Sequence, residues 1–475
     1  MKAIDILVES AQKFSNLPVI IDEDGTLTYE ELNRQIALCS SKLKEAGLKA
    51  GMHAAICIKD SREFILYLFA ASACGATVVP LGYYLERGEF KELIRDLAID
   101  CLIHYKDFDC SDLLGQSSSG IDEKFNLTFF ENCAQAAKIN FKNAAFIRPT
   151  SGTTGRAKGV VFSHETILAR VDNALLGLKI GPEDRILWVL PMAYHFIVSI
   201  ILYVRAGAAV IIPKDKKSSN LIEMANKHGA TVLYAGPMDF IELTDENSQT
   251  SLPKLKLCIC TVGGVSPALA EKFQRRHSNI LRQVYGMIEV GLPLGNVLSE
   301  TAPIDSVGKL MSGFDVRLVD DAGKEVPAGT VGALQVRGQG LFDGYFNPFI
   351  PREAVSKESW FPTGDLASCD ENGNFYIAGR HKSMFLVSGM RVFSEEVESV
   401  LNDHPAVKIS RVSLSNKLTG SIRAELEIHS GVNVSTPRIL TYCKERLAPY
   451  KVPQEIVITE KIPLTATGKV LRHEV

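Results

Sequence analysis

The sequence predicts an α/β protein that ends in a small α+β unit. Between residues 28 and 262, short apolar runs alternate with helical segments, a pattern typical of parallel sheets covered by helices. From Val307 to Tyr345 the runs become short and are separated by Gly-rich turns, which indicates a small β unit. From about Lys382 onwards, helical and β-like runs mix over the length of a small domain.

Local signals along the chain predict the individual elements. A helix is expected from Thr28 to about Ala46, because Thr28 can accept a hydrogen bond at the N-cap and Glu31 can complete a capping box. Gln116 to Gly120 is rich in serine and is expected to be a loop. Apolar periodicity predicts the remaining elements: strands at 53–58, 77–80, 186–190, 208–212, 231–234, 255–262, 408–414 and 423–429, and helices at 64–74, 394–403 and 437–447.

Composition excludes several classes of protein. The chain has 475 residues, of which 46% are hydrophobic and 23% charged, and its net charge is −3. These values exclude a disordered chain, and the lack of a basic excess predicts no binding to nucleic acid. Ten cysteines are too few for a disulfide scaffold of this length. A soluble protein of two to four structural units, monomeric or homodimeric, is expected.

The N-terminal residues and the most apolar stretch bear on location. Met1 to Ser10 has no apolar run long enough for a signal peptide. Residues 196–213 are apolar but are interrupted by an arginine and a glycine, which favours a buried helix and strand over a membrane span. Cys258 and Cys260 share one face of an expected strand, where packing is favoured over a metal site. A cytoplasmic protein is therefore predicted.

The sharpest local feature is a loop rich in glycine and threonine between two apolar segments. Glycines let the backbone approach a ligand, its N–H groups can surround an anion, and Lys158 adds a positive charge. The loop is not a Walker A motif, because Ala157 precedes the lysine and Gly159 follows it. A polyphosphate-binding loop is predicted, with a flexible turn as the alternative. Its residues are Thr150, Ser151, Gly152, Thr153, Thr154, Gly155, Arg156, Ala157, Lys158 and Gly159.

With six later motifs, this loop makes the chain similar to the adenylate-forming superfamily, which includes acyl- and aryl-CoA synthetases, stand-alone adenylation enzymes and firefly-type luciferases. The motifs occur in the family's order along nearly the whole chain. After the loop they are Leu190-Pro191-Met192-Ala193-Tyr194-His195, Val262-Gly263-Gly264-Val265-Ser266, Tyr285-Gly286-Met287-Ile288-Glu289, Thr363-Gly364-Asp365-Leu366, Gly379-Arg380 with Val387-Ser388-Gly389, and Pro463-Leu464-Thr465-Ala466-Thr467-Gly468-Lys469.

The resemblance implies two domains joined by a hinge. Residues 1–381 would hold two α/β subdomains and a small β-barrel-like unit, and would bind ATP and the acid. Residues 382–475 would form a mobile α+β domain that carries the catalytic Lys469. Lys382 falls at the hinge position. Rotation about it would withdraw Lys469 and bring Ser388 and Gly389 to a channel for the thiol, where glycine leaves room for a narrow pantetheine arm.

The implied chemistry is the ATP-dependent activation of a carboxylic acid. The carboxylate would attack the α-phosphate to form an acyl-AMP, and the acyl group would then pass to a thiol. By resemblance, Lys469 would bridge the carboxylate and the α-phosphate, and Glu289 would hold Mg²⁺. The loop from Thr150 to Lys158 would bind the β- and γ-phosphates.

The motifs also imply a nucleoside site. Tyr285 would stack on adenine, and Gly263 and Gly264 would allow close approach from its other side. Asp365 would accept hydrogen bonds from the ribose diol, and Arg380 would contact ribose or phosphate. The predicted AMP site also includes the residues that follow Tyr285 in its motif: Gly286, Met287 and Ile288.

Two motifs depart from the family pattern. Ile288 stands where the family usually has a threonine that contacts phosphate, and the loss of such a bond costs on the order of 1.5–3 kcal/mol, or about 10–150-fold in binding or rate. The run 379–386 departs from Gly-Arg-x-x-Asp-x-Ile-Lys, with Ser383 at the aspartate position. A catalytically impaired ATP-binding homologue is therefore one alternative, although the other expected catalytic residues are present.

The substrate-side motif and its surroundings predict the acid. Residues 191–196 contain no acidic side chain, which disfavours an amino acid bound through its α-amine. His195 aligns either with that acidic position, as in aryl-acid activators, or with the histidine beside the carboxylate in acyl-CoA synthetases. The pocket walls are mainly apolar, which favours an aryl or a short-to-medium aliphatic acid. These wall residues are Tyr194, His195, Phe196, Tyr234, Gly236, Met238, Met287 and Leu292.

The acceptor thiol is predicted to be coenzyme A, because residues 387–389 resemble the CoA synthetases. The alternative acceptor is the phosphopantetheine of an acyl or peptidyl carrier protein, since the chain is shorter than most CoA synthetases. A light-emitting oxygenase shares the motifs and is a further alternative. The expected cofactors are ATP, Mg²⁺ and coenzyme A (or carrier-protein phosphopantetheine), and the expected partner is a small carboxylic acid.

Overall fold

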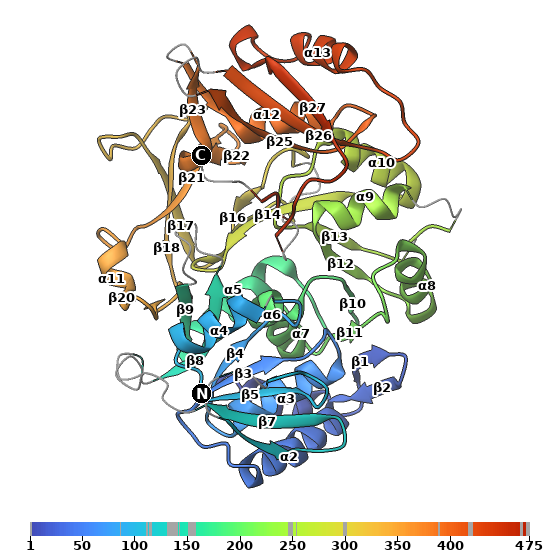
Figure 1. Ribbon diagram of the computed structural model, residues 1–475, viewed down its shortest axis with the longest axis vertical. Helices are drawn as coiled ribbons and strands as arrows, with labels where there is room; N and C mark the ends of the chain where they lie inside the picture. Colours follow the sequence, from blue (N-terminus) through green and yellow to red (C-terminus); the bar gives the residue numbers. More distant parts are fainter. Residues whose placement is uncertain are drawn as a thin grey trace.

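The computed structural model describes residues 2–85, 87–110, 113, 116–130, 141, 143–150, 158–245, 250–252, 254–297, 302–387, 390–416, 421–465 and 469–471. In Figure 1 the N-terminal segments lie at the bottom, the green middle of the chain lies above them, and the orange and red C-terminal segments form the top. Within these residues, no helix has both the length and the apolar character needed to cross a membrane.

Sheet A joins the start of the chain to its middle. Its nine strands run in the order β16-β15-β14-β13-β12-β10-β11-β1-β2, and all neighbours between β14 and β1 are parallel. The strands are short and apolar because both faces of this sheet are covered. They are β1 (Pro18–Asp22), β2 (Gly25–Thr28), β10 (Arg185–Trp188), β11 (Ala209–Ile211), β12 (Val232–Ala235), β13 (Leu257–Cys260), β14 (Leu281–Met287), β15 (Gly291–Gly295) and β16 (Lys309–Leu310).

Sheet B is built mainly from the N-terminal strands. Its order is β20-β19-β9-β8-β4-β3-β5-β7-β6, with a parallel centre from β8 to β5. Its strands are β3 (His53–Cys57), β4 (Thr77–Pro80), β5 (Cys101–Tyr105), β6 (Gln116–Gly120), β7 (Phe125–Phe130), β8 (Ala144–Thr150), β9 (Lys158–Ser163), β19 (Gly344–Tyr345) and β20 (Ile350–Pro351).

The loop expected at Gln116 to Gly120 is wrong, because this segment is the edge strand β6. It pairs with β7 in antiparallel register along its whole length. Thr128 Oγ1 also donates a hydrogen bond of 3.2 Å to Ser118 Oγ across the pair. The segment is therefore a strand because its backbone pairs with β7. A run of serines lacks the apolar pattern that would predict a strand.

Helices connect the strands and cover the sheets. α2 begins with the predicted capping box, in which Glu31 N donates to Thr28 Oγ1 (3.2 Å) and Thr28 N donates to Glu31 Oε2 (2.9 Å). The helices before the C-terminal unit are α1 (Asp5–Lys13), α2 (Tyr29–Glu45), α3 (Arg62–Ala73), α4 (Arg87–Asp96), α5 (His164–Leu178), α6 (Met192–His195), α7 (Ile200–Ala206), α8 (Ser218–His228), α9 (Pro237–Asp245), α10 (Pro267–His277) and α11 (Arg352–Val355).

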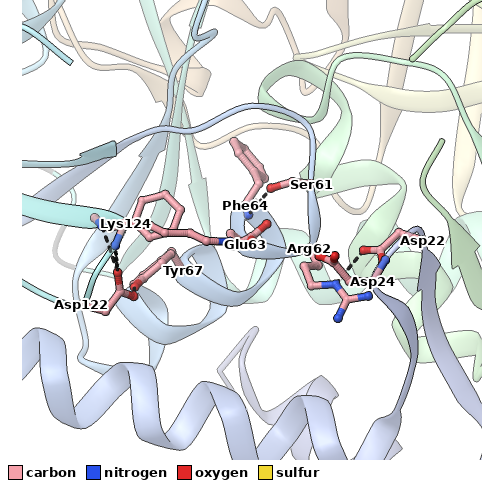
Figure 2. Close-up of polar contacts among 10 residues, drawn as sticks. Asp22, Asp24, Ser61, Arg62, Glu63, Phe64, Tyr67, Asp122 and Lys124 are labelled. Carbon is pink, nitrogen blue, oxygen red and sulfur yellow. Dashed lines mark hydrogen bonds and ion pairs between the residues drawn. The ribbon is translucent and has the colours of Figure 1, made fainter. Parts of the chain in front are cut away.

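Helix α3 is fastened to both large sheets, as Figure 2 shows. At its start, Arg62 forms an ion pair with Asp22, the last residue of β1 in sheet A. One turn further on, the Tyr67 hydroxyl donates to Asp122 in the turn between β6 and β7 of sheet B. Ser61 caps the helix by accepting from Phe64 N at 3.4 Å. These contacts hold the two sheets in a fixed relation around their shared core.

Side chains alternate between two hydrophobic cores along the strands of sheet B. In β3, Ala54 and Ile56 belong to the main core shared by both sheets. Ala55 and Cys57 face a second core beneath α4. In β8, Phe146 belongs to the main core and Ile147 to the second. Because strand side chains alternate, Arg148 lies on the Phe146 face, towards sheet A.

The small β unit is a four-stranded antiparallel sheet in the order β17-β18-β21-β22. It extends beyond Tyr345, where the sequence pattern ended it, because its last two strands come later in the chain. Its strands are β17 (Phe314–Val319), β18 (Gly332–Gly338), β21 (Phe361–Cys369) and β22 (Phe375–Arg380).

The C-terminal unit has a hydrophobic core of its own, which begins at Val387. Strand β26 pairs with β25 in antiparallel and with β27 in parallel orientation, and β27 was not expected from the sequence. The unit contains β23 (Met384–Val387), β24 (Met390–Phe393), α12 (Ser394–Asn402), β25 (Val407–Asn416), β26 (Ser421–Ile428), α13 (Thr436–Lys444) and β27 (Glu455–Thr459). The predicted fold class, α/β with a small α+β C-terminal unit, is confirmed.

Candidate active site

The predicted motifs come together at the carboxyl ends of parallel strands from both sheets. Arg148 lies near the end of β8, and Tyr194 lies on α6, which follows β10. Gly263 and Gly264 follow β13, and Glu289 follows β14. In open α/β sheets this edge is where ligands bind, because the strands point their terminal backbone groups and connecting loops at one crevice.

The nucleotide side of the site, defined here as Tyr285, Asp365 and Arg380, forms one hydrogen-bonded group. Asp365 is 5% exposed and accepts from the Tyr285 hydroxyl at 2.5 Å and from Arg380 Nε at 3.1 Å. Burial, and then the Asp365 charge, raise the pKa of the Tyr285 phenol well above its usual value. The phenol is therefore a permanent donor. The structure brings these three predicted residues together.

The predicted adenine loop contains a strained residue. Val262, directly before Gly263, has a φ of +75°, a conformation that a β-branched residue rarely adopts. The loop is held in place by Val265 N, which donates to Gln283 Oε1 at 3.0 Å. Such strain persists only where the surroundings fix it, and it concentrates at ligand sites. The space beside Gly264 is open, since a Cβ built there would lie 4.0 Å from its nearest neighbour, Gln283 Oε1.

Arg170 on α5 fixes the backbone of the Tyr285 motif. It is 3% exposed, and its three nitrogens donate to Gly340 O (2.8 Å), Ile288 O (2.7 Å) and Glu289 O (3.1 Å). Burial lowers the pKa of this arginine to about 9. Gly286 is also required, because a Cβ would lie 2.4 Å from the carbonyl oxygen of Gly291.

The carboxylate of Glu289 is positioned from one side. Its Oε1 accepts from the Tyr345 hydroxyl at 3.0 Å, and its backbone oxygen accepts from Phe342 N at 2.7 Å. Its Oε2 has no hydrogen-bond partner among the described residues. The Ile288 side chain next to it is half-buried and packs against the main core, so the missing threonine hydroxyl is replaced here by packing.

Lys469 reaches this site from the C-terminal unit. Two hydrogen bonds fix its backbone: Thr465 N donates to Lys469 O (2.7 Å), and Lys469 N donates to Thr465 Oγ1 (3.1 Å). Crowding by the site, and then the neighbouring Arg380, lower the pKa of this lysine, whereas Asp365 and Glu289 oppose that shift. The side chain itself stays solvent-accessible. The catalytic lysine predicted from the last motif therefore lies beside both predicted acids.

The acyl side of the site is defined here as Tyr84, Arg148, Tyr194 and His195. The guanidinium of Arg148 lies 5.3 Å from the centre of the Tyr194 ring, and Tyr194 stacks on Tyr84 with 6.3 Å between ring centres. His195 is 9% exposed, and its Nε2 finds no hydrogen-bond partner among the described residues. Burial, followed by the charges of Arg148 and Lys469, holds the pKa of His195 well below its usual value, so the imidazole is neutral.

The other predicted pocket residues occupy different places. Phe196 is fully buried against Phe64, Phe69 and Phe146, so the structure places it in the core. Tyr234, in β12, is also buried, and burial raises its pKa to about 12. The remaining members lie around the same strand ends: Gly236 before α9, Met238 on α9, and Met287 and Leu292 in β14 and β15.

Several predicted residues lie outside the part of the chain that the structure describes. These are residues 151–157 of the phosphate loop, together with Ser388 and Gly389. The backbones of the flanking residues Thr150 and Lys158 pair with each other across β8 and β9. Lys382 lies in a 3₁₀ turn, His381–Ser383.

Sequence reasoning missed Arg148, Arg170 and Tyr345. The signal for Arg148 was a single arginine inside the apolar run that leads to the phosphate loop. Arg170 and Tyr345 carry no comparable signal, because their partners are backbone oxygens or lie far away in the sequence. The cysteine pair at 258 and 260 is buried, as predicted for a packed strand face.

Comparisons with known proteins agree with this geometry. The family model "AMP-binding enzyme" matches residues 7–346, and the model "AMP-binding enzyme C-terminal domain" matches residues 396–469. A 2-succinylbenzoate–CoA ligase of Bacillus cereus (strain Q1) is 27% identical over 456 residues, which cover 95% of this chain and 94% of that protein.

Two solved structures share the fold. The anthranilate CoA ligase AuaEII in complex with anthranoyl-AMP has a TM-score of 0.88 at 23% identity, covering 99% of this chain and 95% of its own. O-succinylbenzoate coenzyme A synthetase (MenE) from Bacillus subtilis in complex with AMP has a TM-score of 0.85 at 25% identity, covering 98% and 97%.

Fold and site together define an adenylate-forming enzyme, and this prediction is confirmed. The chain belongs to the AMP-binding enzyme family.

Proposed function

We propose that this chain activates a small carboxylic acid with ATP and transfers the acyl group to coenzyme A. In the first half-reaction the carboxylate attacks the α-phosphorus of ATP, and pyrophosphate leaves with the electrons of the broken P–O bond. In the second, the thiolate attacks the acyl carbon and AMP leaves. The observation that carries the proposal is the position of Lys469, from the C-terminal unit, beside Asp365 and Glu289.

The residues of the site divide the first half-reaction between them. The Lys469 ammonium faces the point where two anions must meet, and it offsets their repulsion in a partly water-excluded site. Asp365 accepts the ribose hydroxyls, with Tyr285 and Arg380 fixing its orientation. The neutral imidazole of His195 lies on the acyl side, where it orients the acid without adding charge.

Mg²⁺ fits the single carboxylate of Glu289. A magnesium ion at such a site is usually held by one or two carboxylates together with substrate phosphates and water. Glu289 offers its Oε2, while Tyr345 occupies Oε1 and sets the direction of the carboxylate. When bound, the ion neutralises charge on the phosphates. The arginine-anchored backbone at Glu289 would keep this ligand in position.

The second half-reaction requires Lys469 to leave the site. We place the domain boundary at Lys382, dividing the chain into residues 1–381 and 382–475, with Ser388 and Gly389 forming the thiol channel after rotation. The separate core that begins at Val387 supports this division, as does the short turn at His381–Ser383 between β22 and β23. The paired residues Val387 and Met390 would carry the channel residues between them.

The acid is an aryl acid in this proposal, and coenzyme A is its acceptor. The Tyr84–Tyr194 stack gives the acyl side a flat aromatic wall, which suits a planar ring. The names of similar proteins, which are CoA ligases of 2-succinylbenzoate, support an aromatic acid and free coenzyme A rather than a carrier protein. A cytoplasmic location fits the free cysteines of the described chain, which are typical of a reducing compartment.

The direct test is acid-dependent exchange of labelled pyrophosphate into ATP, followed by acyl-CoA formation. The full chain is supplied with ATP, Mg²⁺ and single aryl or aliphatic acids, and CoA is then added. We expect exchange with aryl acids and stoichiometric loss of free thiol after CoA addition. Tight ATP binding without exchange for any acid would contradict the enzyme function. Exchange without thiol loss would contradict coenzyme A as the acceptor and favour a carrier protein.

A further inference from the structure

Arg148 stands out among the charged groups of the acyl side because it has no anionic partner among the residues that the structure describes. Its Nε is shut off from solvent and makes no hydrogen bond, and no described residue forms an ion pair with it. The residue as a whole is half-buried, so the rest of its guanidinium remains reachable. Burial lowers its pKa to about 10, which leaves it charged at neutral pH.

The fold explains why this arginine faces the acyl side. Strand alternation in β8 puts it on the same face as Phe146, which packs near Phe196 at 6.4 Å between ring centres. That face turns towards α6, so that Arg148 lies over the ring of Tyr194. The cation is therefore held at one end of the aromatic wall that Tyr194 and Tyr84 form.

The carboxylate whose charge acts on Arg148, that of Glu289, already has other partners. Glu289 is the only carboxylate among the groups that raise the pKa of Arg148, and it accepts from Tyr345 and is the proposed Mg²⁺ ligand. Arg170, in contrast, is fully buried and donates all three nitrogens to backbone oxygens. These hydrogen bonds give Arg170 a structural role. They do not explain why Arg148 is placed at the site.

We propose that Arg148 binds a second carboxylate on the substrate, so that the enzyme selects a dicarboxylic acid. A guanidinium has a planar fork that pairs with a carboxylate through two parallel hydrogen bonds. Arg148 lies close enough to Lys469 for its charge to lower the pKa of that lysine. The carboxylate that is activated must lie at Lys469, so a carboxylate paired with Arg148 is a second group on the same acid, near the first. This inference rests on the proposed function, because it assigns a specificity residue to the same site.

A matched pair of acids tests it most sharply. 2-Succinylbenzoate and 4-oxo-4-phenylbutyrate differ by a single ring carboxylate, and adipate and hexanoate form an aliphatic pair. In pyrophosphate exchange, the wild-type chain should prefer the diacid of its accepted pair at least about tenfold in kcat/KM. Arg148→Met should lower kcat/KM for that diacid about 10–150-fold, mainly through KM, so that the ratio of diacid to monoacid kcat/KM falls to near one.

Two further variants separate charge, hydrogen bonding and general damage. Arg148→Lys keeps the charge but not the fork, so the diacid preference should fall to an intermediate value. Arg170→Met removes a second arginine of the site, one that supports the backbone of Glu289, so it should lower activity with both acids of a pair by the same factor. An equal loss of kcat/KM for both acids in Arg148→Met would overturn the proposal. It would assign this arginine to nucleotide binding or to the fold.

A binding measurement separates this inference from the proposed function. Titration calorimetry of the same acid pair, in the presence of a non-hydrolysable ATP analogue, reports affinity without turnover. Tighter diacid binding by wild type than by Arg148→Met, without any exchange, would leave the Arg148 assignment standing and contradict the ligase. Pyrophosphate exchange without a preference for the diacid would contradict the Arg148 assignment and leave the ligase function standing. If Arg148→Met does not fold, the wild-type preference and the Arg148→Lys variant still decide the outcome.

Discussion

The nucleotide side and the acyl side of the site differ in how completely their polar groups are paired. On the nucleotide side, Asp365 receives hydrogen bonds from Tyr285 and Arg380, and every member of the group has a protein partner. On the acyl side, Arg148 Nε and His195 Nε2 are buried and have no hydrogen-bond partner within the described part of the chain. Both sides lie at the same strand ends, so their position in the fold does not cause this difference.

The difference teaches which part of the site is general and which is particular to this chain. A pre-paired nucleotide side can bind the same ligand in every member of a family, because its geometry does not depend on the acid. Buried polar groups that lack a protein partner are costly, and in native proteins each calls for an explanation. On the acyl side, the substrate is the partner that would satisfy them. The predictions below probe each side in turn.

Removal of the group that serves both sides should have the largest effect. Lys469→Ala should lower acid-dependent pyrophosphate exchange by on the order of 10²–10³-fold, because it removes a charge aimed at the reacting anions. Thioester formation from supplied acyl-AMP should change less than about threefold, since Lys469 has left the site by then. Stopped-flow or quench measurements of the two half-reactions give both values.

The control for this prediction is Lys444→Ala, an exposed lysine on α13 of the same unit. It should leave both half-reactions unchanged. Equal loss of both half-reactions in Lys469→Ala would contradict the alternation of domains.

A change confined to the nucleotide side should leave the choice of acid intact. Asp365→Ala should raise KM for ATP about 10–150-fold, because it removes an anion that accepts from ribose and from two protein donors. The ratio of diacid to monoacid kcat/KM should stay at its wild-type value, in contrast to Arg148→Met. Asp315→Asn, an exposed aspartate in the same small sheet, is the control. A changed acid ratio in Asp365→Ala would show that the two sides are not independent.

The pH dependence of the rate should separate the two half-reactions, and this test leaves the residues of the acyl side unchanged. Burial and Arg380 lower the pKa of Lys469, and the first half-reaction needs its protonated form. The alkaline fall in adenylation should therefore begin at lower pH than for an ordinary lysine, and thioester formation should lack that limb. Arg380→Ala removes a neighbouring positive charge, so the limb should move to higher pH. An unmoved limb would contradict the assignment to Lys469, and Arg337→Ala serves as the control.

The smallest effect is expected at the contact between the two domains. His429 Nδ1, at the end of β26, lies 3.3 Å from Asp245 Oδ2 at the end of α9. This partly exposed pair should add only modestly to the arrangement in which Lys469 faces the site. His429→Ala should lower adenylation less than about fivefold, with equal effect on both acids of a pair. A double-mutant cycle with Asp245→Ala measures the coupling, and independent effects would rule the contact out.

The sequence predicted most of the fold because strong local patterns coincide with the elements. The capping box at Thr28 and Glu31 is formed as expected, and the buried run before Gly207 is α7. Two of the misses share one cause, which is strand pairing that local patterns do not report. β6 is a serine-rich strand defined by its neighbour, and the small sheet is completed by β21 and β22 from later in the chain.

The candidate site divides in the same way. Tyr285, Asp365 and Lys469 sit in motifs, and the structure brings them together as the resemblance implied. Phe196 was expected in a pocket wall but lies in the core, because residues two apart on a helical turn, here Tyr194 and Phe196, point to nearly opposite sides. Arg148 was overlooked because an arginine inside an apolar strand gains meaning only when its partners, or their absence, are known in space.

The most direct test of the account is one exchange experiment with the full chain and the two acids that differ by a ring carboxylate. ATP, Mg²⁺ and labelled pyrophosphate are supplied, and coenzyme A is added after exchange is measured. The account predicts acid-dependent exchange, at least about tenfold better with the diacid, followed by consumption of one thiol per AMP formed. No acid-dependent exchange with either acid, or with the adipate and hexanoate pair, would contradict it.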